Sequence, residues 1–194
     1  MKRMQNAALI LLVSAIVGQS LYLAFRTTPR DDPGPPAAQV RVGDTLGFLS
    51  GHVEEGTATT VPLREEPGAV TVLYAFHSEC GFSDDVAPVW GRHFATPDSG
   101  TSGVRRIALT RDPPGAAADY ARRFGWRVEL LSVSRFPDTS REHALVARTP
   151  WAFVFDSDGV LRFHDHGAEL ERIDKAIAAI AVDTVHRGPG QDQR

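Results

Sequence analysis

The chain has a single cysteine, Cys80, in 194 residues, and this scarcity excludes two kinds of site. An intrachain disulfide needs two cysteines, and a cysteine-rich zinc site needs more. The cellular compartment therefore cannot be inferred from disulfide usage, and only a targeting sequence can indicate it.

A surplus of basic residues is also missing. The chain has 21 Lys and Arg against 24 Asp and Glu, for a formal net charge of -3 and a pI near 6.1. Nucleic-acid-binding proteins carry a basic face that neutralises phosphates, often together with aromatic side chains that stack on bases. The composition predicts no nucleic-acid partner, and its 42% hydrophobic and 23% charged residues are typical of a soluble domain.

Charge is absent from one long run, Ala7–Phe25, which follows Lys2 and Arg3. As a helix this run would be about 28 Å long, close to the bilayer core of about 30 Å. A cleaved signal peptide ending near Gly18 is the alternative. We favour an anchor because no clean small-x-small cleavage motif follows, and Tyr22 continues the apolar run. The positive N-terminus predicts a single-pass protein with its domain on the extracytoplasmic or periplasmic side.

The remaining sequence predicts one domain after a spacer. TTPRDDPGPPAAQ is rich in Pro and Gly, so it forms neither helix nor sheet and behaves as an extended linker. The predicted organisation is a cytoplasmic N-terminus (1–6), a transmembrane anchor (7–25), a linker (26–39), an α/β domain (40–185) and a disordered tail (186–194).

Hydrophobic periodicity within the domain predicts alternating strands and helices. Strand Val70–Phe76 is almost continuously apolar, as expected for a central strand that is covered on both faces. The other expected elements are a hairpin in Val53–Leu63, a helix from about Ser83 containing Pro88, strand Val104–Thr110, helix Ala116–Trp126 stopping at Gly125, strand Val128–Val133, a short Ser- or Thr-capped helix in TSREHALVAR, a hairpin turning at Asp156–Gly159, and helix Ala168–Val182. This alternation indicates an α/β fold with a mixed sheet.

Several ordered motifs resemble the thioredoxin-fold proteins of the membrane-anchored TlpA/ResA-like group, which is related to the alkyl-hydroperoxide-reductase (AhpC/TSA) and redoxin families. VGDTLGFLSG is similar to the opening motif of that group, and VTVLYAFHSECGFS to its central strand and active-site turn. Pro88 lies eight residues after Cys80, and RTPWAFVFDSDGVL resembles the segment that contains the group's cis-proline, here Pro150 after Thr149.

The resemblance implies a three-layer sandwich around a central mixed sheet. It also implies thiol-disulfide chemistry without a cofactor or metal, on protein or small-molecule thiols and disulfides. The residues implied are Cys80 and Ser83 for catalysis, and Glu79, Gly81, Phe82, Thr149 and Pro150 for substrate contacts.

The sequence departs from that group at the second thiol. Where the group has Trp-Cys-x-x-Cys, this chain has Glu79-Cys80-Gly81-Phe82-Ser83. A hydroxyl cannot release a mixed disulfide by attacking sulfur, so an intramolecular cycle is excluded. Two hypotheses about the function are favoured over the others. One is monothiol exchange through Cys80 with resolution by an external thiol, and the other is a redox-degenerate module that binds a partner around Glu79, Phe82 and Pro150.

Peroxidase and metal handling are minor alternatives. A one-cysteine peroxiredoxin has Thr or Ser three residues before its cysteine and Pro seven before, whereas this chain has His77 and Leu73. Copper-chaperone relatives need two cysteines. His164 and His166 lie on one face of a regular strand, where they are candidate ligands together with Asp165 or Cys80, or solvated residues at a strand end.

Two opposing effects act on the predicted pKa of Cys80. A helix N-terminus and the Ser83 hydroxyl favour the thiolate, while the nearby carboxylates of Glu79, Asp84 and Asp85 disfavour it. His77 is the local group that offsets them when protonated. We expect a thiol less reactive than is usual in the resembling group, with Ser83 serving as a helix cap.

Overall fold

A seven-stranded mixed sheet forms the centre of the protein. The computed structural model describes residues 39–64, 68–95 and 103–186. The predicted anchor, most of the linker and the predicted tail after His186 lie outside this part of the chain. His186, predicted to begin the tail, is the last residue of a helix. Among the described residues, no helix has the length and apolar character needed to cross a membrane.

The order of the strands across the sheet is β2-β1-β5-β4-β3-β6-β7. Strands β3, β4 and β5 are parallel, whereas β1, β2, β6 and β7 pair antiparallel with their neighbours. The bounds are β1 (Phe48–His52), β2 (Ala58–Pro62), β3 (Val70–Phe76), β4 (Val104–Thr110), β5 (Glu129–Ser132), β6 (Trp151–Phe155) and β7 (Leu161–His166).

Strand β3 matches its predicted bounds and is buried along its whole length. Val72, Tyr74 and Phe76 face one apolar cluster, and Leu73 and Ala75 face the other. Alternate side chains of a strand point to opposite faces, so a strand that is apolar at every position needs cover on both sides. The prediction of a strand covered on both faces is therefore confirmed.

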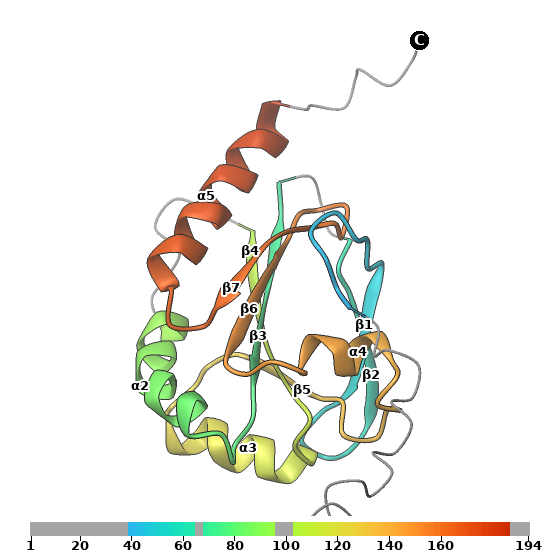
Figure 1. The fold of residues 1–194 in the computed structure, drawn as a ribbon, viewed down its shortest axis with the longest axis vertical. Coiled ribbons are helices and arrows are strands. Elements are labelled where there is room, and N and C mark those ends of the chain that lie inside the picture. The colour runs from blue at the N-terminus through green and yellow to red at the C-terminus, as the bar shows by residue number, and fades with distance from the viewer. Residues whose placement is uncertain (1–38, 65–67, 96–102, 187–194) are drawn as a thin grey trace, which may run out of the picture. The chain divides into compact units, whose positions relative to one another are not determined.

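Helices cover both faces of the sheet and complete three layers (Figure 1). On one face lie α2 (Gly81–Ala95), α3 (Pro114–Arg123) and α5 (Leu170–His186), packed around the aromatic side chains of Tyr74, Trp90, Phe94 and Trp126. The short helix α4 (Arg141–Leu145) covers the other face. The expected α/β sandwich with a mixed sheet is confirmed.

Several local predictions hold because they depended on short-range chemistry. Ser140 caps α4 by accepting a hydrogen bond from the His143 amide at 3.1 Å. Gly125, with a φ of 66°, follows the end of α3. Between β6 and β7, the Asp156 carboxylate accepts hydrogen bonds from two backbone N–H groups, and Gly159 has a φ of 73°.

Several boundaries differ from the prediction: the helix predicted at 116–126 is Pro114–Arg123, and the last helix, predicted at 168–182, is Leu170–His186. Two further differences, at the first hairpin and at α2, have a local cause. The first hairpin begins at Phe48, and Val53 lies in its turn, where its N–H donates to the Thr57 carbonyl. Gly56, with a φ of 75°, allows the chain to reverse there. Helix α2 begins at Gly81, two residues before the predicted start, because the Cys80 carbonyl already accepts hydrogen bonds from the helix.

Candidate active site at the start of helix α2

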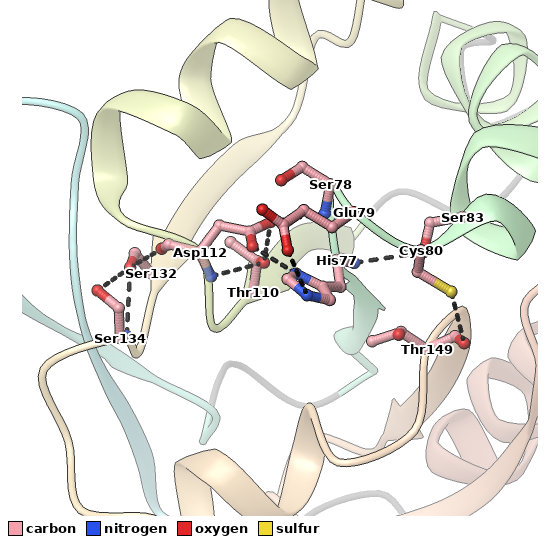
Figure 2. A network of polar contacts seen from close by, with 10 residues as sticks. All are labelled: His77, Ser78, Glu79, Cys80, Ser83, Thr110, Asp112, Ser132, Ser134 and Thr149. Atoms are coloured by element: carbon pink, nitrogen blue, oxygen red, sulfur yellow. Dashed lines mark hydrogen bonds and ion pairs between the residues drawn. The ribbon is translucent and has the colours of Figure 1, made fainter.

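Cys80 lies at the junction between β3 and α2, at the carboxyl end of the parallel strands. Its carbonyl accepts hydrogen bonds from the N–H groups of Ser83 at 2.8 Å and Asp84 at 3.1 Å. Its half-buried sulfur lies 3.6 Å from the carbonyl oxygen of Thr149, to which the thiol donates (Figure 2). The sulfur therefore sits at the N-terminus of a 15-residue helix, where unpaired backbone N–H groups favour an anion.

Burial raises the pKa of the Cys80 thiol, but hydrogen bonds to the sulfur outweigh this effect. The donors are the Ser83 amide, the side chains of Thr149 and Ser83, and the Phe82 amide, so the pKa lies below its usual value. The Thr149 carbonyl favours the neutral thiol, whereas these donors favour the thiolate. The site is therefore arranged to hold a thiolate.

The carboxylates that were expected to disfavour this thiolate are either exposed to solvent or paired with a basic side chain. The Glu79 side chain is 87% exposed, and Asp85 is exposed on the outer side of α2. Asp84 lies 4.0 Å from the Arg123 guanidinium. Water screens exposed charges strongly, so the short-range hydrogen bonds dominate the pKa of Cys80. That the Cys80 thiol is less reactive than is usual in the resembling group stays a prediction.

Ser83 does not cap the helix, in contrast to the prediction. It is the third residue of α2, its side chain is buried, and Cys80 occupies the capping position instead. The Ser83 hydroxyl accepts a hydrogen bond from the His77 N–H at 3.3 Å, which leaves its proton for the Cys80 sulfur. Ser83 therefore stabilises the Cys80 thiolate, although its own hydroxyl cannot act as a nucleophile toward sulfur.

Asp112 is a site residue that the sequence did not reveal. Its buried carboxylate accepts hydrogen bonds from the Ser78 N–H at 2.7 Å and the Thr110 hydroxyl at 2.9 Å, and it pairs with Nδ1 of His77 (Figure 2). The Ser132 hydroxyl donates to the Asp112 carbonyl. The available signal was the position of Asp112 just after β4, because the ends of adjacent parallel strands meet at one edge of the sheet.

The role expected for His77 changes accordingly. Its ring is bound to Asp112 on the side of the turn away from the sulfur, and its Nε2 lies 4.0 Å from the Glu79 carboxylate (Figure 2). His77 therefore acts on Cys80 through the backbone, by the hydrogen bond from its N–H to the Ser83 hydroxyl. Its ring belongs to the structure that holds the turn in place.

The structure brings both predicted site segments together. Gly81 and Phe82 are exposed beside Cys80, with 70% of Phe82 accessible. Across from them, the Thr149–Pro150 peptide bond is cis, as the resemblance implied. Thr149 is half-buried beside the sulfur, while Pro150 is buried. The contact between Cys80 and Thr149 joins segments that are 69 residues apart in the chain.

The two histidines of β7 are poorly arranged for a metal. Nδ1 of His164 accepts a hydrogen bond from the Trp151 indole at 3.2 Å, and Nδ1 of His166 accepts one from the Ala168 N–H at 3.2 Å. A neutral imidazole that accepts at Nδ1 carries its proton on Nε2, so neither nitrogen has a lone pair available for a metal. Within the described ranges, no cluster of three or more His, Cys, Asp or Glu residues is placed to bind a metal ion.

Comparison with known proteins identifies the fold. No protein-family model and no curated protein sequence matches the chain. Among solved structures, a putative thiol:disulfide interchange protein DsbE from Chlorobium tepidum superposes with a TM-score of 0.58 and 17% identity, covering 74% of this chain and 99% of that one. A peroxiredoxin-like protein from Aquifex aeolicus gives 0.57 and 15%, covering 74% and 90%.

A third structure, the C-terminal domain of a putative thiol-disulfide oxidoreductase from Bacteroides thetaiotaomicron, gives a TM-score of 0.57 with 13% identity and covers 73% of this chain and 99% of that domain. At these identities the likeness concerns the arrangement of helices and strands. The strand order, the cis-proline beside the cysteine and these neighbours together show that the chain has the thioredoxin-like fold of thiol-disulfide oxidoreductases and peroxiredoxin-like proteins.

Proposed function

We propose that this protein is a monothiol thiol-disulfide oxidoreductase in which Cys80 is the nucleophile. The observation that carries the proposal is the set of donors around the sulfur, whose hydrogen bonds lower the pKa of Cys80 despite its burial. The thiolate is the reactive form in exchange, so this arrangement supports nucleophilic attack.

The reaction has two steps that conserve electrons. The Cys80 thiolate attacks a disulfide R–S–S–R′, forms Cys80–S–S–R and releases R′–S⁻, which takes up a proton. An external thiol R″–SH then loses its proton and attacks the mixed disulfide. This second step gives R–S–S–R″ and restores the Cys80 thiolate.

The external thiol is required because this chain holds one cysteine and Ser83 occupies the position of a resolving thiol. The Ser83 hydroxyl is one of the groups that lower the pKa of the Cys80 thiol, so it lies near the sulfur. A sulfur at position 83 would therefore lie close to Cys80. This geometry makes Ser83→Cys an informative variant.

We further propose that the domain is tethered on the outer side of a cytoplasmic membrane. The support is the uncharged run Ala7–Phe25 after two basic residues, followed by a linker rich in Pro and Gly. Membrane fractionation of cells, followed by protease treatment of intact spheroplasts, tests this topology. Release of the chain in soluble form, or protection of residues 40–185 from the protease, would contradict it.

The main test is the reaction of the full-length protein with the neutral 2-hydroxyethyl disulfide, followed by mass spectrometry. The wild type is expected to form one mixed disulfide, and Cys80→Ala none. Added thiol should restore the free cysteine of the wild type. Ser83→Cys is expected to convert the mixed disulfide into an internal one without added thiol.

A second candidate function, partner binding without turnover, is favoured by the exposure of Phe82 beside the site. The same experiment separates the two. A Cys80 thiol that reacts no faster than a free small-molecule thiol, and that Ser83→Cys leaves unchanged, would overturn the exchange mechanism. Binding of a partner that persists in Cys80→Ala would then favour the binding module.

A further inference from the structure

We infer that the Cys80 site selects disulfides in polypeptides whose cysteine is flanked by a basic and an apolar residue. The inference rests on the proposed function, because it names the substrate class of the same thiol. It depends on the charges and apolar side chains that surround the sulfur on the outer surface. None of these follows from the fold alone.

The exposed charge around Cys80 is negative. Glu79, which precedes the cysteine, is 87% exposed, and Asp85 is exposed on α2. Asp84 is offset by Arg123, whose guanidinium lies 4.0 Å away. Glu79 and Asp85 therefore place two exposed carboxylates within five residues of a sulfur that is itself an anion when it reacts, and an anionic substrate is repelled by all three charges.

Two basic side chains near the site, His77 and Arg148, are directed away from the exposed carboxylates or are partly covered. The His77 ring is held by the buried carboxylate of Asp112, and its side chain is only 18% exposed. Arg148 lies on the side of Thr149, where its guanidinium stands 5.6 Å above the Trp151 ring. The negative charge therefore lies on the α2 side of the sulfur, and a basic residue of the partner is expected to face that side.

The outer face of α2 adds apolar contacts along the same side. Phe82 is 70% exposed and Val89 is 42% exposed, and they stand on one helix face with Asp85 between them. Seven residues of helix extend about 10 Å. An extended polypeptide of about three residues covers this length, so a polypeptide segment bound at Cys80 is the occupant that this helix face fits.

The test uses synthetic peptides, each with one cysteine joined by a disulfide to 2-thiopyridine. The leaving group is then the same for every peptide, and its release reports attack on the peptide sulfur. Four peptides combine Lys or Glu on one side of cysteine with Leu or Ser on the other. The rates with the full-length protein are divided by those of a small neutral thiol under the same conditions, which removes intrinsic differences in reactivity.

We expect the Lys peptides to react about tenfold faster than the Glu peptides at low ionic strength, with the ratio falling in 0.5 M salt. The double variant Glu79→Gln/Asp85→Asn should reduce the ratio to about threefold or less. Replacing Ser by Leu should speed the wild type about threefold, and Phe82→Ala should abolish this gain. Asp158→Asn, an exposed carboxylate at the opposite end of the sheet, is the matched control and should keep both preferences.

The outcomes separate this inference from the function beneath it. Equal rates for Lys and Glu peptides, or a Lys preference that the double variant leaves unchanged, would overturn the selectivity while the exchange activity stands. A Lys preference that Asp158→Asn also removes would show an effect of net charge and not of the site, and would overturn it too. If neither the peptides nor 2-hydroxyethyl disulfide react at Cys80, the proposed function itself fails.

Discussion

The two sides of the active-site turn are built differently. On the inner side, the buried Asp112 carboxylate receives hydrogen bonds from Ser78, Thr110 and the His77 ring. On the outer side, Cys80 is half-buried, and its neighbours Glu79 and Phe82 extend into solvent. The inner side is polar and closed, and the outer side carries the reactive atom and is open.

The difference shows how a turn can expose a reactive side chain while its backbone is held in one conformation. A buried carboxylate that accepts several hydrogen bonds fixes the backbone that leads into the cysteine, because leaving any of these groups unpaired is costly. The Ser83 hydroxyl links the two sides, since it accepts from the His77 N–H and donates to the Cys80 sulfur. The inner side accordingly determines stability, and the outer side reactivity.

The largest expected effect comes from removing the inner carboxylate. Asp112→Ala leaves the Ser78 N–H and the Thr110 hydroxyl without their acceptor, and the expected loss of unfolding free energy is about 3 kcal/mol. Asp112→Asn, which keeps one acceptor oxygen, should lose about half as much. Urea unfolding measures both, with Asp158→Asn as an exposed control. A loss below about 1 kcal/mol for Asp112→Ala would show that the inner side does not hold the turn.

A smaller loss of unfolding free energy is expected for a substitution at Gly167, which lies next to the cis-proline. A Cβ at Gly167 would lie 2.3 Å from the Trp90 ring and 3.2 Å from the Pro150 ring. The Trp90 indole also donates to the Gly167 carbonyl at 2.8 Å, so the ring cannot move freely. Gly167→Ala should therefore lower the unfolding free energy by about 2 kcal/mol. Gly115→Ala, with no atom within 4 Å of the new Cβ, is the control and should not destabilise in this way.

On the outer side, Ser83→Ala is expected to change reactivity more than stability. Loss of the hydroxyl removes one donor to the sulfur, so the pKa of Cys80 should rise and its alkylation at pH 7 should slow roughly three- to tenfold. The rate of iodoacetamide reaction against pH measures both. At pH values where the thiolate is complete in both proteins, the difference should largely disappear. An unchanged pKa would show that the backbone donors suffice without Ser83.

The smallest expected effect is the pH dependence of stability that Cys80 contributes. Its pKa is lowered in the folded state, while in the unfolded chain a thiol titrates near about 8.5. The folded state therefore binds fewer protons, and the thiolate contributes stability that is complete above the unfolded pKa and lost as the pH falls through the folded pKa. Relative to Cys80→Ser, the wild type should gain stability as the pH rises toward 9 in the presence of a phosphine reductant. A difference independent of pH would contradict the lowered pKa.

Much of the fold could be predicted because its elements carry local patterns. The uniform apolar character of Val70–Phe76 reports burial on both faces, and the buried positions Ile173 and Ile177 of α5 follow helical spacing. The starts of β1 and α2 were missed, since each depends on which backbone groups find partners. Val53 lies in a turn despite its β-branched side chain, and Cys80 takes the capping position in place of Ser83.

The sequence by itself determined that this protein has one thiol, near the start of a helix, and no second one, because those facts are matters of residue identity and local periodicity. Only the tertiary structure decided that His77 pairs with Asp112, 35 residues away, and that Thr149 faces the sulfur from 69 residues away. Hydrogen bonds reach only about 3 Å, so their partners are set by the way strands align and not by spacing along the chain. The pKa of Cys80 is lowered by donors at the start of its own helix, Ser83 and Phe82, and by the Thr149 side chain that the fold brings to the sulfur.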